Sequence, residues 1–162
     1  MGRINELEFS RTSKEISLPR RGSEEAAGLD LALPYDIVLA PGDKTFVDTG
    51  VAFNIPEEHY MLIAPRSSNG DNKRADSSPL FEVKLALDNT IACIDSDYTG
   101  TIKLKITNLG NTTFIGYKGD YVVQAILQEY TKTDALVEVD TILKQTKRGD
   151  NGFGSSDTVK RT

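Results

Sequence analysis

The chain has 162 residues and a net charge of −5, which is enough length for one domain with a hydrophobic core and too little for two large ones. No basic stretch is sustained, which disfavours binding to a nucleic-acid backbone but still allows a small anionic ligand that needs only a few cations. A single cysteine, Cys93, excludes an internal disulfide framework and a cysteine zinc cluster, and neither a membrane-length apolar run nor a signal peptide stands out. We therefore expect a soluble, cytoplasmic protein that binds neither membrane nor nucleic acid.

Short strands between turn signals are the dominant pattern along the chain. In residues 102–107, three aliphatic side chains alternate with Lys103, Lys105 and Thr107, which is the period-two pattern of a strand. Comparable segments predict strands near residues 4–9, 29–33, 35–41, 44–56, 60–64, 91–94, 114–117, 121–130 and 136–139, with a short helix or strand at 80–87. Since few stretches support a long amphipathic helix, the sequence predicts an all-β barrel or sandwich.

Residues 95–100, with the sequence DSDYTG, form the predicted turn of a hairpin that spans residues 91–110. Asp, Ser and Gly are ordinary turn formers. A turn needs neither an aromatic residue such as Tyr98 nor two carboxylates, Asp95 and Asp97, on either side of a serine. Because these residues are not needed to form a turn, the hairpin is a candidate site. The alternative is a plain polar loop.

Two further segments carry groups suited to phosphate. The Arg-Ser-Ser sequence at 66–68 follows an apolar strand, and an arginine fork beside short hydroxyls fits phosphate oxygens, although a simple turn explains the same residues. The tail at 147–162 is either disordered or a lid, in which glycine N–H groups cradle phosphates and Phe153 stacks on a base. The only histidine, His59, lies at a predicted surface loop, so histidine-dependent nucleophilic catalysis is not expected.

Five polar motifs follow one another along the chain. They are AAGLDLAL at 26–33, APRSS at 64–68, NTIACIDSDYTG at 89–100, GDYVVQAI at 119–126 and RGDNGFGSS at 148–156. The third and fifth motifs are highly specific. In this order the five resemble the motifs of the trimeric dUTP pyrophosphatase (dUTPase) family.

This resemblance implies a jelly-roll-like β-barrel of the β-clip type, formed by residues 1–146, with a flexible C-terminal arm at 147–162. Three such subunits would form a homotrimer with sites at the subunit interfaces, each closed by the arm of a neighbour. The implied reaction is Mg²⁺-dependent hydrolysis of dUTP to dUMP and pyrophosphate. That activity limits uracil incorporation into DNA and supplies dUMP for thymidylate synthesis.

The same resemblance gives a role to each matching residue. It implies Asp95 as the catalytic carboxylate that orients and activates water, and Asp30 as a motif carboxylate in the metal–water shell. Contacts to uracil and deoxyribose are implied for Asn89, Ala92, Ile94, Tyr98 and Phe153. Contacts to the phosphates are implied for Arg66, Ser67, Ser68, Gln124, Arg148, Gly154, Ser155 and Ser156.

The chain departs from the family's pattern at several positions. Leu29 replaces a tyrosine, Ala92 replaces a glycine, and Tyr121 replaces an arginine, which leaves residue 121 without that charge. Residues 69–79 look like an insertion, and two glycines of the arm are replaced. Because none of these changes removes the implied catalytic carboxylate, we do not infer lost activity.

Two other functions stay open on the sequence. A dCTP deaminase of the same fold superfamily also carries an Arg-Ser-Ser element, but its catalytic glutamate lies on the strand after the third motif, where this chain has Lys103 and Lys105. The other alternative is a nucleotide-gated regulator that holds a protein partner through the loop at 69–79.

Overall fold

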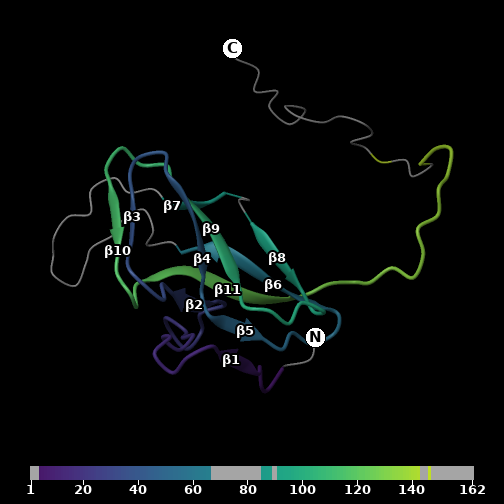
Figure 1. The fold of residues 1–162 in the computed structure, drawn as a ribbon. Helices are drawn as coiled ribbons and strands as arrows, with labels where there is room; N and C mark the ends of the chain where they lie inside the picture. The colour runs from purple at the N-terminus through teal and green to yellow at the C-terminus, as the bar shows by residue number, and fades with distance from the viewer. Residues whose placement is uncertain (1–3, 67–84, 89–90, 143–145, 147–162) are drawn as a thin grey trace, which may run out of the picture. The chain divides into compact units, whose positions relative to one another are not determined.

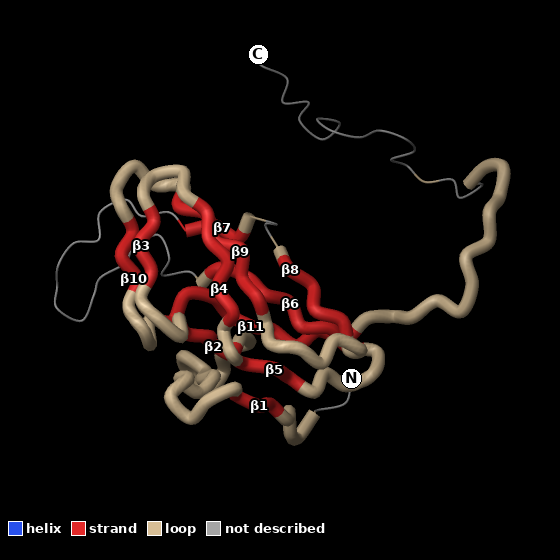
Figure 2. The backbone as a smooth tube through the Cα atoms, viewed as in Figure 1, coloured by secondary structure: helices blue, strands red, loops and turns tan. Residues whose placement is uncertain are grey.

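The computed structural model describes residues 4–66, 85–88, 91–142 and 146, which are drawn in colour in Figure 1. Contacts divide the chain into two units, Met1–Lys132 and Thr133–Thr162. Every described strand lies in the first unit, and no helix occurs within the described ranges (Figure 2). It follows that no helix there is long and apolar enough to cross a membrane. The predicted all-β class is confirmed.

The strands pair between segments that are distant in sequence. In chain order they are β1 (Phe9–Arg11), β2 (Leu29–Ala32), β3 (Ile37–Leu39), β4 (Lys44–Asp48), β5 (Val51–Phe53), β6 (His59–Pro65), β7 (Leu85–Leu87), β8 (Ala92–Asp95), β9 (Lys103–Asn108), β10 (Phe114–Gly116) and β11 (Tyr121–Glu129). They form a four-stranded sheet β2-β11-β6-β8, a three-stranded sheet β4-β9-β7, and the pairs β1-β5 and β10-β3. All these pairings are antiparallel, and none joins two consecutive strands of the described chain, as expected for a jelly roll rather than a meander.

One hydrophobic core receives side chains from both of the larger sheets. Met61 and Ile63 of β6 and Leu104 and Ile106 of β9 are almost completely buried and belong to the same cluster. The two residues of each pair are two positions apart in sequence, so both project to the same, inward face of their strand. Burial of this apolar area is the main stabilising term of the barrel.

The predicted hairpin at 91–110 is wrong, although both of its strands exist. β8 pairs with β6, whereas β9 pairs with β4 and β7 in the other sheet. Period-two alternation shows that a strand has one buried face, but it does not show which strand is the partner. Residues 95–102, here called the β8–β9 turn, begin at the last residue of β8 and therefore connect two sheets of one barrel.

Two other strand predictions need correction. The predicted strand at 44–56 is broken into β4 and β5 at Gly50, whose φ of 69° favours glycine and whose added Cβ would lie 2.8 Å from Thr12 Oγ1. No strand forms at 136–139, where Leu136 and Val137 are 95% and 80% exposed. An apolar alternation without a partner strand or a core to cover cannot hold a β conformation.

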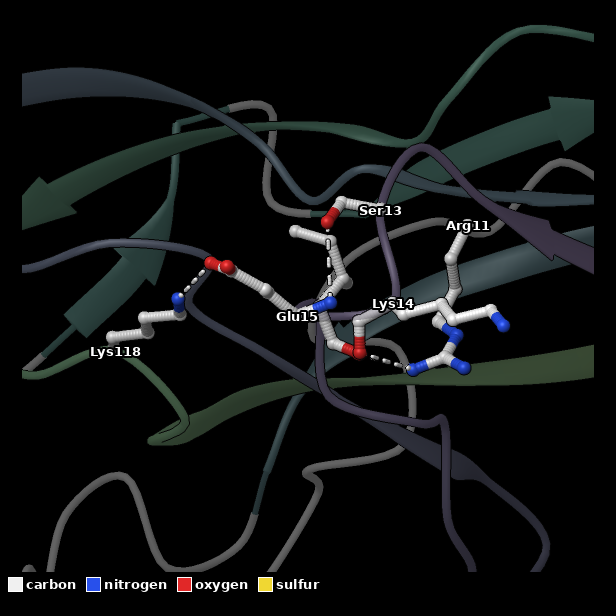
Figure 3. A network of polar contacts seen from close by, with 6 residues as sticks. Arg11, Ser13, Lys14, Glu15 and Lys118 are labelled. Carbon is white, nitrogen blue, oxygen red and sulfur yellow. Dashed lines mark hydrogen bonds and ion pairs between the residues drawn. The ribbon is translucent and has the colours of Figure 1, made fainter.

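The first predicted strand begins later than expected, at Phe9. The loop after it is held by polar contacts that Figure 3 shows from close by. The Arg11 guanidinium donates hydrogen bonds to the carbonyls of Lys14 and Ile16, and Glu15 forms a 3.0 Å ion pair with Lys118. These contacts fix the path of the chain towards Arg20 and β2.

Candidate active site

The β8–β9 turn presents Asp95 and Tyr98 on the surface of the barrel. Asp95 is the last residue of β8, which is an edge strand of the four-stranded sheet, and it lies opposite Tyr60 of β6. The Tyr98 backbone N–H donates to the Asp95 carbonyl over 3.1 Å, and the Tyr98 hydroxyl donates to the carbonyl of Thr101 over 2.9 Å. Both side chains are exposed, so a carboxylate and an aromatic ring are offered together from a fixed turn.

Two hydrogen bonds, one of them buried, anchor the far end of this turn to the other sheet. The hydroxyl of Thr49 is completely buried and donates to the Ile102 carbonyl over 2.9 Å, while Thr101 Oγ1 donates to Asp48 Oδ2 over 2.9 Å. Buried polar groups that are fully paired rigidify their surroundings. The turn is thus held at both ends rather than free to move as a surface loop.

Alternation along β8 separates core residues from surface residues. Ala92 and Ile94 are partly buried and pack against the hydrophobic core, whereas Cys93 and Asp95 are exposed. The side chain of residue 92 therefore points towards the protein. Ala92 and Ile94 can therefore offer a ligand only their backbone N–H and C=O groups.

A second polar cluster, here called the phosphate end, forms where β2, β11 and β6 meet. Arg66 Nη2 pairs with Asp30 Oδ2 at 3.0 Å, and Arg66 Nη1 donates to the Tyr121 carbonyl over 2.7 Å. Asp30 is only 8% exposed, so the guanidinium supplies the partner that a buried carboxylate requires. Gln124, also predicted to need partners, donates from Nε2 to the Pro65 carbonyl over 3.0 Å.

Strand register places these side chains on one face of the sheet. Asp30 lies opposite Gln124, and Gln124 lies opposite Ala64, two residues before Arg66. Facing residues of antiparallel strands project to the same side. Gly28 approaches Gln124 so closely that an added Cβ would lie 2.5 Å from Gln124 Oε1, which explains the glycine of the first motif. Three of the predicted residues are therefore brought together.

Sequence reasoning missed Arg20, which also lies at the phosphate end. Its guanidinium carbon is 4.0 Å from the centroid of the Tyr121 ring, and its backbone exchanges hydrogen bonds with Asp30. The basic pair at 20–21 was visible in the sequence. Its contact with residue 121, about one hundred positions away, carried no sequence signal.

The two clusters lie apart within one chain. Asp95 of β8 is opposite Tyr60 of β6, whereas Gln124 of β11 is opposite Ala64 of β6. The strands β8 and β11 pair with opposite edges of β6. Four residues of strand correspond to roughly 13 Å, before the width of the sheet is added. The structure therefore does not bring Asp95 together with Asp30, Arg66 and Gln124 in a single chain.

A carboxylate at the end of β7 fixes the chain just before the third motif. Asp88 pairs with Lys44 at 2.7 Å and with Lys105 at 3.0 Å, and Thr107 Oγ1 donates to it over 3.1 Å. Hydrogen bonds from Lys44 and Lys105 hold the pKa of Asp88 well below its ordinary value. The ionised form is thus favoured by the folded state.

We expect Asp88→Asn to lower the melting temperature at neutral pH by about 2–4 °C. Because the folded-state pKa of this carboxyl is depressed, its contribution is present above the unfolded pKa and is lost as the pH falls through the folded pKa. The difference in melting temperature between wild type and variant should therefore become smaller as the pH falls below about 4. Thermal melts across this pH range, with Glu25→Gln as an exposed control, test this. A gap that stays constant in acid contradicts the assignment.

Direct coordination of Mg²⁺ requires several oxygen donors around the ion. No group of three His, Cys, Asp or Glu side chains that could hold a metal ion occurs among the described residues. Asp30 has one oxygen engaged by Arg66, so it fits an outer role through water better than direct coordination. Mg²⁺ keeps several waters and is commonly held by substrate phosphates, which is compatible with this set.

Several predicted residues lie outside the described part of the chain. They are Ser67, Ser68, Asn89, Arg148, Phe153, Gly154, Ser155 and Ser156, together with the loop at 69–79. Their implied roles, and the predicted boundary between residues 146 and 147, stay predictions.

The fold and the two clusters define a class: an all-β, barrel-like protein that carries groups for an anion at one place and, at another, a carboxylate suited to activating water. Known proteins specify the family. The dUTPase family model matches residues 14–157. The deoxyuridine 5′-triphosphate nucleotidohydrolase of Mus musculus is 36% identical over 150 residues, covering 93% of this chain and 84% of that protein. The chain belongs to the dUTPase family, so the resemblance seen in the five motifs is confirmed.

Other relatives and a solved structure agree. The deoxyuridine 5′-triphosphate nucleotidohydrolase of Escherichia phage T5 is 36% identical over 146 residues, with coverage of 86% of this chain and 90% of that one. The structure of the Staphylococcus bacteriophage 80alpha dUTPase with dUPNHPP aligns with a TM-score of 0.79 at 24% identity, covering 94% of this chain and 99% of that chain. This structural likeness supports the jelly-roll-like fold.

Proposed function

We propose that this protein hydrolyses dUTP to dUMP and pyrophosphate with Mg²⁺. The observation that carries the proposal is the β8–β9 turn, where the most specific motif of the family presents Asp95 and Tyr98 from a backbone fixed by hydrogen bonds. Soluble nucleotide metabolism in the cytoplasm fits the single cysteine of the chain.

Asp95 is assigned as the base that orients the attacking water. The water oxygen bonds to the α-phosphorus while the bond from that phosphorus to the bridging oxygen breaks. Pyrophosphate leaves, and the proton of the water passes to the Asp95 carboxylate. A positioned carboxylate of this kind contributes about 10²–10⁴-fold to rate. An exposed position at the end of an edge strand leaves Asp95 free to face substrate.

Tyr98 is assigned to the sugar. A ring packed under the deoxyribose leaves no room for a 2′-hydroxyl, which discriminates dUTP from UTP by exclusion. The uracil edges are assigned to Asn89 and to the backbone around Ala92 and Ile94, and Phe153 of the arm is assigned to the opposite face of the base. Hydrogen-bond polarity at position 4 of the base then rejects cytosine.

The phosphate end is assigned to the triphosphate. Arg66 and Gln124, with Ser67, Ser68 and the arm residues Arg148, Gly154, Ser155 and Ser156, are the proposed donors to phosphate oxygens. Mg²⁺, when bound with the triphosphate, offsets charge that builds up during phosphoryl transfer. Asp30 positions Arg66, and its second oxygen would be available to accept a hydrogen bond from water bound to the metal.

We further propose that the working site is assembled between subunits of a homotrimer. Within one chain, Asp95 and Gln124 lie opposite different ends of β6, on strands that pair with its two opposite edges. In this arrangement the phosphate end of a neighbour lies next to the β8–β9 turn, and the arm of a neighbouring subunit closes the site. Closure excludes bulk water and strengthens the remaining electrostatic interactions.

Pyrophosphate release with Mg²⁺ from dUTP, dCTP, dTTP and UTP tests the proposal. A strong preference for dUTP with dUMP as product is expected. Release of ammonia from dCTP would instead move the chain to the deaminase branch, which the absence of a glutamate from β9 (KLKITN) disfavours. Tight nucleotide binding without either reaction would identify a nucleotide-gated regulator that binds a protein partner.

Gly100→Ala is expected to reduce discrimination between dUTP and UTP by about tenfold. An added Cβ at residue 100 would lie 2.7 Å from the Tyr98 hydroxyl and 2.8 Å from the ring carbon that bears it, so the ring must move. The ratio of kcat/KM for the two nucleotides measures this. Gly22→Ala is the matched control, because its added Cβ would meet nothing closer than Asp30 Oδ2 at 4.0 Å, an ordinary van der Waals distance. Wild-type discrimination in Gly100→Ala would show that ring position does not set sugar choice.

A further inference from the structure

Arg20 and Tyr121 form a stacked pair at the phosphate end. The Arg20 guanidinium carbon lies 4.0 Å from the centroid of the Tyr121 ring. The ring is fixed because its hydroxyl donates to the Leu18 carbonyl over 3.1 Å. The backbone of Arg20 is fixed by two hydrogen bonds with Asp30, of 3.2 Å and 2.7 Å. Both partners of the stack are therefore held from outside it.

The charge of Arg20 is not neutralised by any described residue. Among these residues, Arg66 is paired with Asp30, and Arg21 donates to the Ala26 carbonyl, but the Arg20 guanidinium has neither an ion pair nor a hydrogen bond. It is exposed, and it stacks on the Tyr121 ring. A planar fork with five N–H donors is thus presented towards solvent.

This unneutralised charge lies on the face that carries the predicted phosphate ligands. Arg20 bridges to Asp30, and Asp30 is opposite Gln124, so the three side chains share one side of the sheet. Arg66 donates to the carbonyl of Tyr121 over 2.7 Å, and so the two arginines contact the same residue. Because the opposite charges of Arg66 and Asp30 cancel, Arg20 supplies the net positive charge among the described residues of the phosphate end.

Resting on the proposed function, we infer that Arg20, held flat on Tyr121, is an additional triphosphate-binding residue of this chain. A fixed guanidinium donates to phosphate oxygens with little loss of side-chain entropy, since the stack has already ordered it. Cation–π contact leaves the edges of the guanidinium plane free for these bonds. Arg20 contributes binding energy to the β- and γ-phosphates and not to the nucleoside, which binds at the β8–β9 turn.

Calorimetric binding of α,β-imido-dUTP and of dUMP to the full-length protein tests the inference. We expect Arg20→Gln to weaken α,β-imido-dUTP by about tenfold, a typical value for one charge-assisted contact, and to leave dUMP within about twofold. The salt dependence of α,β-imido-dUTP binding should also become shallower. Lys14→Gln, which removes one exposed charge elsewhere, should bind both ligands as the wild type does.

Tyr121 variants separate the stack from the charge. Tyr121→Phe keeps the ring and should bind normally, whereas Tyr121→Leu should lose part of the affinity for α,β-imido-dUTP. Arg20→Gln combined with Tyr121→Leu should be no weaker than Arg20→Gln alone, because the ring acts through the guanidinium. Unchanged binding in Arg20→Gln, or an equal loss for both ligands, overturns the inference. Wild-type protein that binds no α,β-imido-dUTP overturns the proposed function along with it.

Discussion

Asp95→Asn is expected to lower dUTP turnover by about 10²–10⁴-fold while α,β-imido-dUTP binds within about threefold of the wild type. Asparagine has nearly the same shape as aspartate but cannot accept the proton of the attacking water. The residue ends an edge strand and is exposed, so the substitution disturbs no core contact. Single-turnover hydrolysis and equilibrium binding together measure the two parts of this expectation.

Asp97→Asn provides the matched control for that experiment. Asp97 lies two residues away in the same exposed turn and loses the same charge when substituted. If both variants lose turnover equally, the effect comes from the charge of the turn and not from a base at residue 95. Full turnover in Asp95→Asn would remove Asp95 from the mechanism altogether.

Removal of residues 147–162 is expected to reduce turnover by about 100-fold or more and to leave the melting temperature of the barrel nearly unchanged. The described strands end with β11 at Glu129, so none of the described β pairing is lost. What is lost is the implied lid with Arg148 and Phe153, and with it the phosphate donors and the exclusion of water.

A shorter deletion of residues 158–162 keeps the whole fifth motif and serves as the control. It should retain wild-type turnover, because the residues implied to contact the nucleotide end at Ser156. Circular dichroism and thermal melts of both deletions test folding independently of activity. A long deletion that keeps full activity would show that the arm has no part in catalysis.

The sequence predicts local structure well where one face of a strand is buried. Ile102, Leu104 and Ile106 alternate with polar residues, and β9 lies where that pattern places it, from Lys103 to Asn108. β11 matches the apolar run from residue 121 almost to its end. In both cases the pattern records burial, which is a local property of each residue.

Partners and paired groups could not be predicted in the same way. β8 and β9 are neighbours in sequence, yet they belong to different sheets, because pairing depends on the whole topology. A solvated carboxylate is the ordinary expectation for Asp30, which instead is buried against Arg66. Nothing in the local pattern around Asp30 predicts that Arg66, at the end of another strand, pairs with it. The motif resemblance implies a role for both of these residues, whereas no local pattern predicts that Arg20 lies beside them.

The separation of the phosphate end from the β8–β9 turn has a consequence for damaged chains. When each site takes its carboxylate from one subunit and its phosphate donors from another, a chain with a defective turn still lends an intact phosphate end to its neighbour. Two chains, each inactive alone through a different defect, then regain some working sites when they assemble together. If the proposed site between subunits is right, we expect genetic complementation between alleles of this one protein, because Asp95 and Gln124 lie apart along β6.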